Sequence, residues 1–197
     1  MSCQLPSTLV EVQMVKCGLT QSTSSVICNS AKLQRLDLSG NDLQSFEYNN
    51  TGTIRKLTVL NDLEKLNLSD NRNLHTFTLA GLTKLKVLDL RCCNIQQLPS
   101  GMSDLHHIEK LYLGGNKLGL SFTFSCLQGK HLQTLGLYSC DIEKVQWELM
   151  SPNISYELDL AGNKRLSCLP NNMWNALNLK RLDLSGSGIS SIPNTGK

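Results

Sequence analysis

Leucines recur along the chain in a fixed pattern of hydrophobic and polar positions. The stretch Leu33 to Leu43 reads L-x-x-L-x-L-x-x-N-x-L, and eight copies of this pattern start near residues 9, 33, 63, 85, 108, 132, 155 and 179. Successive starts lie 22 to 24 residues apart, with one longer interval of 30. The copy that starts at Leu9 is the most divergent. Self-similarity at a fixed period indicates a repeat architecture, in which each copy forms one structural unit.

Each copy contains a short alternation that predicts a β-strand. In L-x-L the side chains point to opposite faces in turn, so the leucines are buried on one face and the x residues lie on the other. The Asn falls where the chain turns, and its carboxamide can bond the backbone of adjacent turns to make a ladder. A single copy cannot bury its own apolar face, so neighbouring copies must stack. The pattern therefore predicts one parallel sheet.

The repeats resemble the leucine-rich repeat family over essentially the whole chain. Several copies continue as L-P-x-x-(L/M)-x-x-L, most clearly Leu98 to Leu105 and Leu169 to Leu177. This form is similar to the repeats of intracellular scaffolds, Roco-type kinases, repeat-bearing phosphatases and plant cytosolic immune receptors. The resemblance implies an α/β fold, a curved leucine-rich repeat solenoid. Its parallel β-sheet would line the concave face, with short helices, 3-10 turns or loops on the convex face.

Residues 1–197 are predicted to form a single repeat domain, with local departures from the pattern. The copy from Leu33 carries an insertion after Phe46, which we interpret as a tolerated surface loop. The spacing of Ile54, Leu57 and Leu60 would also suit a short helix. The copies from 63 and 155 have one extra residue before the closing Leu, which predicts a bulge in each turn. Neither end has a cysteine cluster as a cap, so we expect a fragment of a larger protein.

The eight cysteines are spaced in a way that argues against disulfides. Cys17, Cys93 and Cys140 hold the Asn position of the first, fourth and sixth copies. Strands about 4.8 Å apart would separate Cys93 from Cys140 by roughly 10 Å. A disulfide needs Cα atoms within about 7 Å, and a zinc site needs ligands that converge. Two further cysteines are expected to point inward on the convex side as apolar fillers, namely Cys28 and Cys126. Reduced thiols predict a cytoplasmic protein.

Three N-glycosylation sequons favour an extracellular location as the alternative. They start at Asn49, Asn67 and Asn153. A glycan on Asn67 would lie on the concave face and obstruct it. We give the cysteine spacing more weight than the sequons, some of which arise by chance in an Asn-rich repeat.

Charge and composition narrow the class of partner. The net charge of +3, from 19 basic and 16 acidic residues, is too mild to indicate nucleic acid or an anionic membrane. No run of about 18 apolar residues is present that could span a bilayer. We therefore expect a protein partner, no nucleic acid and no membrane insertion. The oligomeric state is left open.

The chain contains no recognisable catalytic motif. We find no C-x-x-C, H-E-x-x-H, G-x-S-x-G or glycine-rich phosphate loop. His106 and His107 fall in the turn before a strand and are expected to be solvated. Cys92 is expected near the surface at a strand end, and a structural role is favoured over a redox role. We predict no enzymatic activity, no cofactor and no metal site.

The x residues of the strands are the candidates for binding a partner, because they escape the core. The candidate partner-binding residues on this face are Arg35, Lys65, Val87, Asp89, Arg91, Lys110, Tyr112, Tyr138, Asp159 and Arg181. Asp159 and Asp183 hold the same position in neighbouring copies, which costs energy between like charges. Arg181 and Lys180 could offset that repulsion.

The middle of the predicted face differs from its ends. Tyr112 and Tyr138 are large rings on a face that should be wet, and Gly114 and Gly136 leave space beside them. Tyr and Arg are favoured anchors of protein interfaces. Our hypothesis is a protein-binding patch centred on Tyr112, Tyr138, Arg91 and Lys110. The alternative is that the rings only cover the sheet.

The sequence thus predicts a protein-interaction module that acts through its concave face. One alternative is the ectodomain of an extracellular receptor that recognises a ligand or a pathogen. Another is the regulatory arm of an enzyme, such as a kinase, GTPase or phosphatase, with its catalytic domain elsewhere.

Overall fold

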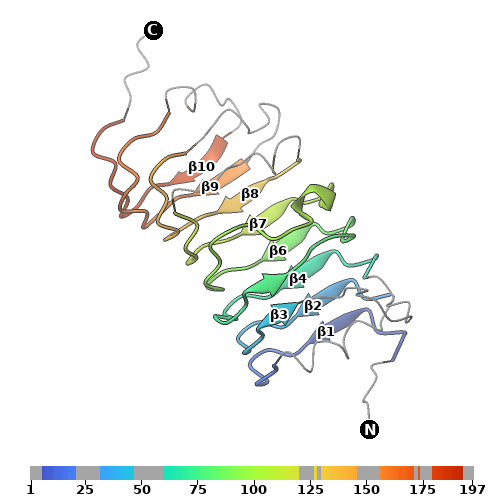
Figure 1. Ribbon diagram of the computed structural model, residues 1–197. Coiled ribbons are helices and arrows are strands. Elements are labelled where there is room, and N and C mark those ends of the chain that lie inside the picture. Colours follow the sequence, from blue (N-terminus) through green and yellow to red (C-terminus); the bar gives the residue numbers. More distant parts are fainter. Residues whose placement is uncertain are drawn as a thin grey trace.

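Eight short strands form one parallel sheet that runs along the whole array (Figure 1). The computed structural model describes residues 6–20, 32–46, 60–119, 127, 130–145, 156–170, 173 and 179–192. In sheet order the strands are β1 (Glu11–Gln13), β2 (Arg35–Asp37), β4 (Lys65–Asn67), β6 (Val87–Asp89), β7 (Lys110–Tyr112), β8 (Thr134–Gly136), β9 (Tyr156–Asp159) and β10 (Leu179–Asp183). Each strand begins within two residues of a predicted start of a copy. The predicted solenoid with a parallel sheet is confirmed.

The buried leucine at the centre of each strand sets the register of the sheet. Leu66 pairs with Leu36 on one side and with Leu88 on the other, and the same position continues through Leu111 and Leu135. All five side chains are buried in a single core cluster. A slip of one residue would turn a whole strand's apolar side chains to solvent. The hydrophobic pattern is therefore sufficient to align the repeats.

The predicted ladder of carboxamides is present at the turn after the strands. Asn116 donates through Nδ2 to the carbonyl oxygens of Leu90 (2.7 Å) and Leu113 (2.6 Å). Its Oδ1 accepts the backbone N–H groups of Cys93 and Ile95, both at 3.0 Å. This one buried side chain therefore bonds four main-chain groups of the core, which must find partners once they leave water. Equivalent carboxamides donate to the carbonyls of two successive repeats, namely Asn41, Asn71 and Asn163.

Two cysteines take the place of Asn in this ladder. The thiol of Cys93 donates to Leu68 O at 3.1 Å, and that of Cys140 donates to Leu113 O at 3.2 Å. Both side chains are buried, and burial raises the pKa of the Cys93 thiol to about 12 and that of Cys140 to about 11. Cys17 holds the same position in the first repeat but is exposed. The buried pair serves as hydrogen-bond donors to the backbone.

The residue before the ladder position adopts a left-handed backbone conformation in every repeat. Four of these residues are glycines, but Lys16, Asp70, Cys92 and Ser139 have the same positive φ. Cys92 is half-buried near the end of β6, as predicted, and its side chain lies against the glycine of the next repeat. Backbone geometry at this turn is therefore fixed by the repeat, whatever the residue.

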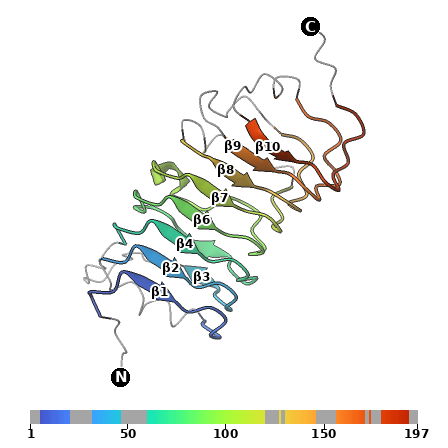
Figure 2. The same ribbon diagram turned by 180° about the vertical axis from the view of Figure 1, so that it is seen from behind.

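The side of the array opposite the long sheet holds less regular structure (Figure 2). A second, two-stranded sheet joins β3 (Ser45–Phe46) to β5 (Thr76–Phe77), and η1 (Met102–Asp104) is one turn of 3-10 helix. The extra residue predicted after Asn71 is absorbed in a turn closed by Leu74 N–H to Asn71 O at 3.0 Å. The insertion at 47–59, with its alternative helix, lies outside the described residues, as do the two cysteines expected to point inward, Cys28 and Cys126.

Candidate functional site

Two tyrosine rings lie across the outer face of the sheet where the neighbouring strand offers no side chain. The ring of Tyr112 on β7 packs over Gly136, where an added Cβ would be 3.3 Å from Tyr112 Cδ1. The ring of Tyr138, just after β8, occupies the space above Gly114. The glycines therefore act as sockets that let the rings lie close to the backbone. This is the space that the sequence predicted beside the tyrosines.

Arg91 is held in place beside this pair by Asp89. Arg91 Nε lies 2.9 Å from Asp89 Oδ1, and Nη2 lies 2.6 Å from Oδ2. The guanidinium is 5.5 Å from the centroid of the Tyr112 ring, which is the range of a cation–π contact. The hydrogen bond with Asp89 raises the pKa of Arg91 above its ordinary value. Asp89 itself is 7% exposed, so it supports Arg91 and presents little surface to a partner.

The hydroxyl of Tyr138 remains a neutral polar group at the edge of the site. The pKa of Tyr138 is raised above its ordinary value, and burial of the side chain makes the largest contribution to this rise. Its oxygen lies 3.9 Å from the sulfur of Cys92, where either atom can donate. The half-exposed hydroxyl can thus donate to, or accept from, a group that lies on the ring.

The tyrosines open onto a depression of about 230 Å³ that extends to the C-terminal strands. We call it the tyrosine depression, and the charged residues of its wall are Arg91, Glu157, Asp159, Arg181 and Asp183. Asp159 and Asp183 are direct neighbours in the sheet, as predicted. Each carboxylate accepts a hydrogen bond of 3.0 Å from the backbone N–H of the residue two positions later in the chain. In Asp183 this bond makes the largest contribution to lowering the pKa.

These aspartates have a local role that sequence reasoning missed. Asp37 and Asp89 also accept the N–H two residues on, at 2.9 and 3.1 Å. The signal was present as an Asp at the end of four strands, β2, β6, β9 and β10. Asp side chains commonly bond the backbone two residues ahead. The row of carboxylates is therefore part of the turn, and it also gives the depression its acidic wall.

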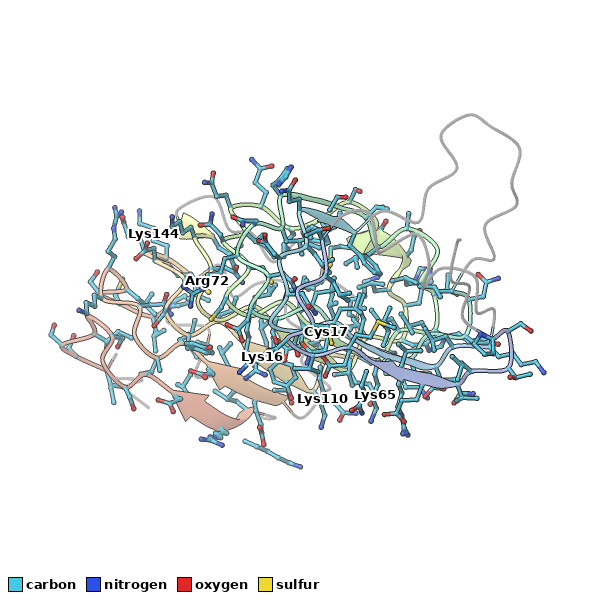
Figure 3. The ribbon with its side chains drawn as sticks, turned by 90° about the horizontal axis from the view of Figure 1, so that it is seen from below. Lys16, Cys17, Lys65, Arg72, Lys110 and Lys144 are labelled. Atoms are coloured by element: carbon cyan, nitrogen blue, oxygen red, sulfur yellow. The ribbon has the colours of Figure 1, made fainter. Side chains whose placement is uncertain are left out.

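The other predicted residues lie in the N-terminal half of the same face. Arg35, Lys65, Val87 and Asp89 line a second depression of about 230 Å³, in which Arg35 pairs with Glu11 at 3.3 Å. Lys110 is exposed on β7 and lines neither depression. Lys65 and Lys110 lie on the strand side of the molecule, and Arg72 and Lys144 lie away from it (Figure 3). The structure thus divides nine of the ten candidates between two depressions and leaves Lys110 outside both.

Metal-binding clusters and membrane-spanning helices are absent from the residues that the structure describes. Within them, no three His, Cys, Asp or Glu side chains are grouped so as to hold a metal ion. The same part of the chain has no helix of the length and hydrophobicity that a membrane crossing requires. His106 and His107 are exposed, as predicted for this turn.

Family models match two segments of the chain. Residues 61–118 match a model described as "Leucine rich repeat", and residues 29–45 match a second leucine-rich repeat model. The matched segments include the strands β2, β4, β6 and β7.

Curated relatives share the repeats at modest identity. The human volume-regulated anion channel subunit LRRC8A is 28% identical over 72% of this chain and 20% of its own length. The zebrafish (Danio rerio) transforming growth factor beta activator LRRC33 is 30% identical over 95% of this chain and 28% of its own length. Receptor-like protein 9a of Arabidopsis thaliana is 30% identical over 54% of this chain and 12% of its own length. The chain thus spans less than a third of the length of each of these proteins.

Solved structures support the fold. TLR13, in a complex with ssRNA13, superposes with a TM-score of 0.63 at 21% identity, over 92% of this chain and 30% of that chain. An LRR protein of Leptospira interrogans superposes with a TM-score of 0.54 at 23% identity, over 83% of this chain and 45% of that one. At these identities the likeness extends to the solenoid alone.

Proposed function

Because the chain belongs to the leucine-rich repeat family, whose fold is a recognition fold, we propose that it binds a protein partner through the concave face of its sheet. The observation that carries this proposal is the arrangement of Tyr112, Tyr138 and Arg91. Two rings rest on glycine sockets, and a guanidinium is fixed against one of them by a buried carboxylate. Side chains that are ordered before binding lose little conformational entropy when a partner arrives.

The contact centre that we propose is the tyrosine depression. Tyr and Arg dominate the binding energy of many protein interfaces, above all where they are partly desolvated and well packed. Tyr112 and Tyr138 are half-buried, and Arg91 is exposed while anchored to Asp89. Lys110, on the outer side of β7, would lie at the rim and contribute mainly to the rate of association.

A protein is favoured over a nucleic acid by the charge of this surface. Three carboxylates line the depression, those of Glu157, Asp159 and Asp183, beside the guanidinium groups of Arg91 and Arg181. Asp89 forms an ion pair with Arg91. Phosphate groups need several unpaired cations along their path, and a row of carboxylates repels them. The likeness to TLR13, which was solved with ssRNA13, is one of fold, and we propose a protein as the partner on the charge of this face.

A cytoplasmic location remains our proposal for the chain. The thiols of Cys93 and Cys140 act as donors within the ladder, which is a use that a disulfide would abolish. The sequon residue Asn67 donates to Asp37 Oδ2 at 3.0 Å within the sheet, which disfavours a glycan on that amide. Thiol counting on protein purified without reductant tests this, since disulfides would support the extracellular alternative.

Site-directed photo-crosslinking tests the proposed face. A benzoylphenylalanine replaces Glu157, which is exposed at the rim of the depression, and in a control protein it replaces Lys117, which is exposed outside it. We expect the probe at 157 to crosslink a discrete protein and the probe at 117 to leave it uncrosslinked. Equal capture by both probes, or capture at 117 alone, would contradict binding through the concave face.

A further inference from the structure

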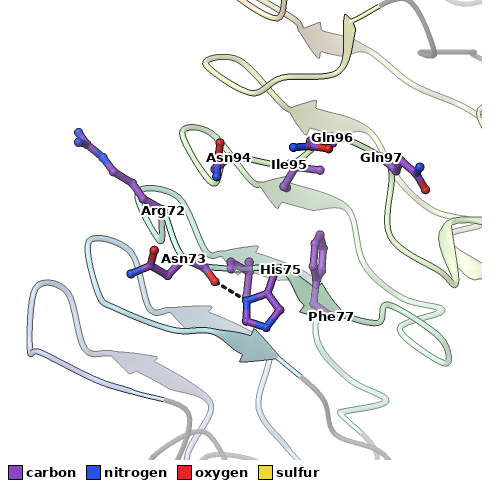
Figure 4. A pocket seen from close by; sticks show the side chains of 9 residues that line it. Arg72, Asn73, His75, Phe77, Asn94, Ile95, Gln96 and Gln97 are labelled. Atoms are coloured by element: carbon purple, nitrogen blue, oxygen red, sulfur yellow. Dashed lines mark hydrogen bonds between the residues drawn. The ribbon is translucent and has the colours of Figure 1, made fainter.

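A hollow of about 520 Å³ lies at the side of the solenoid, between the third and fourth repeats. It is separate from the concave face, because its walls come from the turns that follow β4 and β6 and from β5. Figure 4 shows His75 and Phe77 on one wall, Asn94 to Gln97 on the other, and Arg72 at one end. The volume is within the range of about 300–1,000 Å³ that small-ligand sites occupy. We call it the lateral groove.

A mismatch between the two repeats creates the lateral groove. The third repeat needs a two-residue turn, Arg72 and Asn73, before its buried Leu74. The fourth repeat passes directly from Cys93 through Asn94, in a left-handed conformation with φ 57°, to Ile95. The longer turn stands away from the shorter one, and the walls diverge.

The small sheet also ends at this groove. β5 is bonded to β3 on one side, but towards the fourth repeat it makes only an isolated bridge between Thr78 and Ser100. Pro99 has no N–H and cannot extend a ladder. Thr78 N–H donates towards β3 and Leu79 N–H donates towards Ser100. Since amides alternate along a strand, the N–H of Phe77 points to the side of the groove.

The polar lining carries positive charge and carboxamides. Arg72 and His75 are its basic groups, and none of the residues that line the groove is Asp or Glu. Asn73 is held by Asp42, whose carboxylate it meets at 2.6 Å. His75 Nδ1 lies 2.8 Å from Asn73 O, and since a carbonyl only accepts, Nδ1 is the donor.

The remaining polar side chains are available to a ligand. Arg72, Asn94, Gln96 and Gln97 are exposed, and no hydrogen bond or ion pair engages these four side chains within the described parts of the chain. Leu74 and Ile95 form a buried apolar floor, and the ring of Phe77 is half-buried beside it. A guanidinium binds carboxylates in bidentate fashion, and carboxamides both donate to and accept from peptide groups.

We propose that the lateral groove binds the C-terminal end of an extended peptide, with its carboxylate at Arg72, its backbone along Gln96, Gln97 and the Phe77 amide, and an apolar side chain over Leu74, Ile95 and Phe77. The charge of the lining favours an anionic ligand, and its row of carboxamides with an open strand edge favours a peptide over a simple anion. This proposal is independent of partner binding at the concave face.

Amide shift perturbation by NMR tests the proposal with defined probes. The probes are acetyl-Gly-Phe-Gly with a free carboxylate, the same peptide as its C-terminal amide, and inorganic phosphate. We expect the acid peptide to shift the signals of His75, Phe77 and Gln96 saturably. The amide peptide should bind at least about tenfold more weakly, because the charge-assisted bonds to Arg72 are lost.

Two matched substitutions separate recognition from general charge. Arg72→Gln should weaken the acid peptide about tenfold. Lys164→Gln changes the same position of the other extended turn and should leave binding unchanged. Absence of saturable shifts, equal affinity for the amide peptide, equal effects of phosphate, or wild-type affinity in Arg72→Gln would each overturn the proposal.

Discussion

The ring of Tyr138 occupies the space that a side chain on Gly114 would need, one strand away in the sheet. The backbone of Gly114 does not have a positive φ, so the absence of a side chain there serves the ring and not the turn. A similar but much looser relationship joins Tyr112 to Gly136. The two rings and the two glycines are therefore one structural unit.

Gly114→Ala should displace Tyr138 and destabilise the protein by about 1–3 kcal/mol, as overpacking does. In a Tyr138→Ala background the same change should cost little, because the ring is gone, so the two substitutions should be non-additive. Gly136→Ala, where the ring can give way by a few tenths of an ångström, serves as the milder control. Urea unfolding measures all of these, and an equal cost of Gly114→Ala with and without the ring would refute the socket.

Asn116→Ala should cost at least about 3 kcal/mol of folding free energy. It removes the bonding partner of three main-chain groups, the N–H groups of Cys93 and Ile95 and the carbonyl of Leu90, while Leu113 O keeps the Cys140 thiol. Each buried unsatisfied group costs about 1–3 kcal/mol. Asn73→Ala, at an exposed turn, is the control and should cost less than about 1 kcal/mol. Similar losses of unfolding free energy for the two variants would show that the ladder is not a main source of stability.

The ladder also shows how far sequence reasoning reached. The repeat period placed the strands, the core leucines and Asn116 correctly. Each repeat must bury the same apolar face against its neighbours, so equivalent positions have equivalent surroundings. The lateral groove was not predicted, since it arises from a one-residue difference between two adjacent turns. The ion pair between Asp89 and Arg91 was also missed. The sequence assigned both residues to partner binding because they share a face of the sheet. In the structure Asp89 is buried, so only Arg91 is accessible to a partner.

Stability should fall at alkaline pH because of the two buried thiols. Their pKa values are raised from 9.0 to about 12 for Cys93 and about 11 for Cys140. Above pH 9 the unfolded chain releases these protons and the folded chain keeps them. The thiols therefore stabilise the fold fully below pH 9, and this contribution is lost between pH 9 and about 11 to 12.

The contribution should reach about 1.4 kcal/mol per pH unit for each thiol over that window. A Cys93→Ala/Cys140→Ala variant should start less stable but lose stability less steeply from pH 9 to 11, as measured by unfolding at a series of pH values. Cys17→Ala, at the exposed equivalent position, is the control. Parallel pH profiles for wild type and the double variant would contradict the assignment.

Arg91→Lys should destabilise the protein by about 1 kcal/mol although the charge is kept. A lysine cannot make the two-pronged contact with Asp89, and a buried carboxylate would lose part of its pairing. The cost is moderated because Arg91 is itself exposed. Lys110→Arg, on the same face, is the control, because Lys110 forms no ion pair within the described part of the chain. It should change the unfolding free energy little, and a loss equal to that of Arg91→Lys would count against the Asp89 contact.

The most direct measurement is the affinity of the purified crosslinked partner for Tyr112→Ala/Tyr138→Ala protein. With the control Lys117→Ala/Lys144→Ala, whose changes lie outside the tyrosine depression, affinity should match wild type. Each central aromatic anchor is worth about 2 kcal/mol or more, so the tyrosine variant should bind at least about 100-fold more weakly while remaining folded by circular dichroism. Wild-type affinity in the folded tyrosine variant would contradict the concave site.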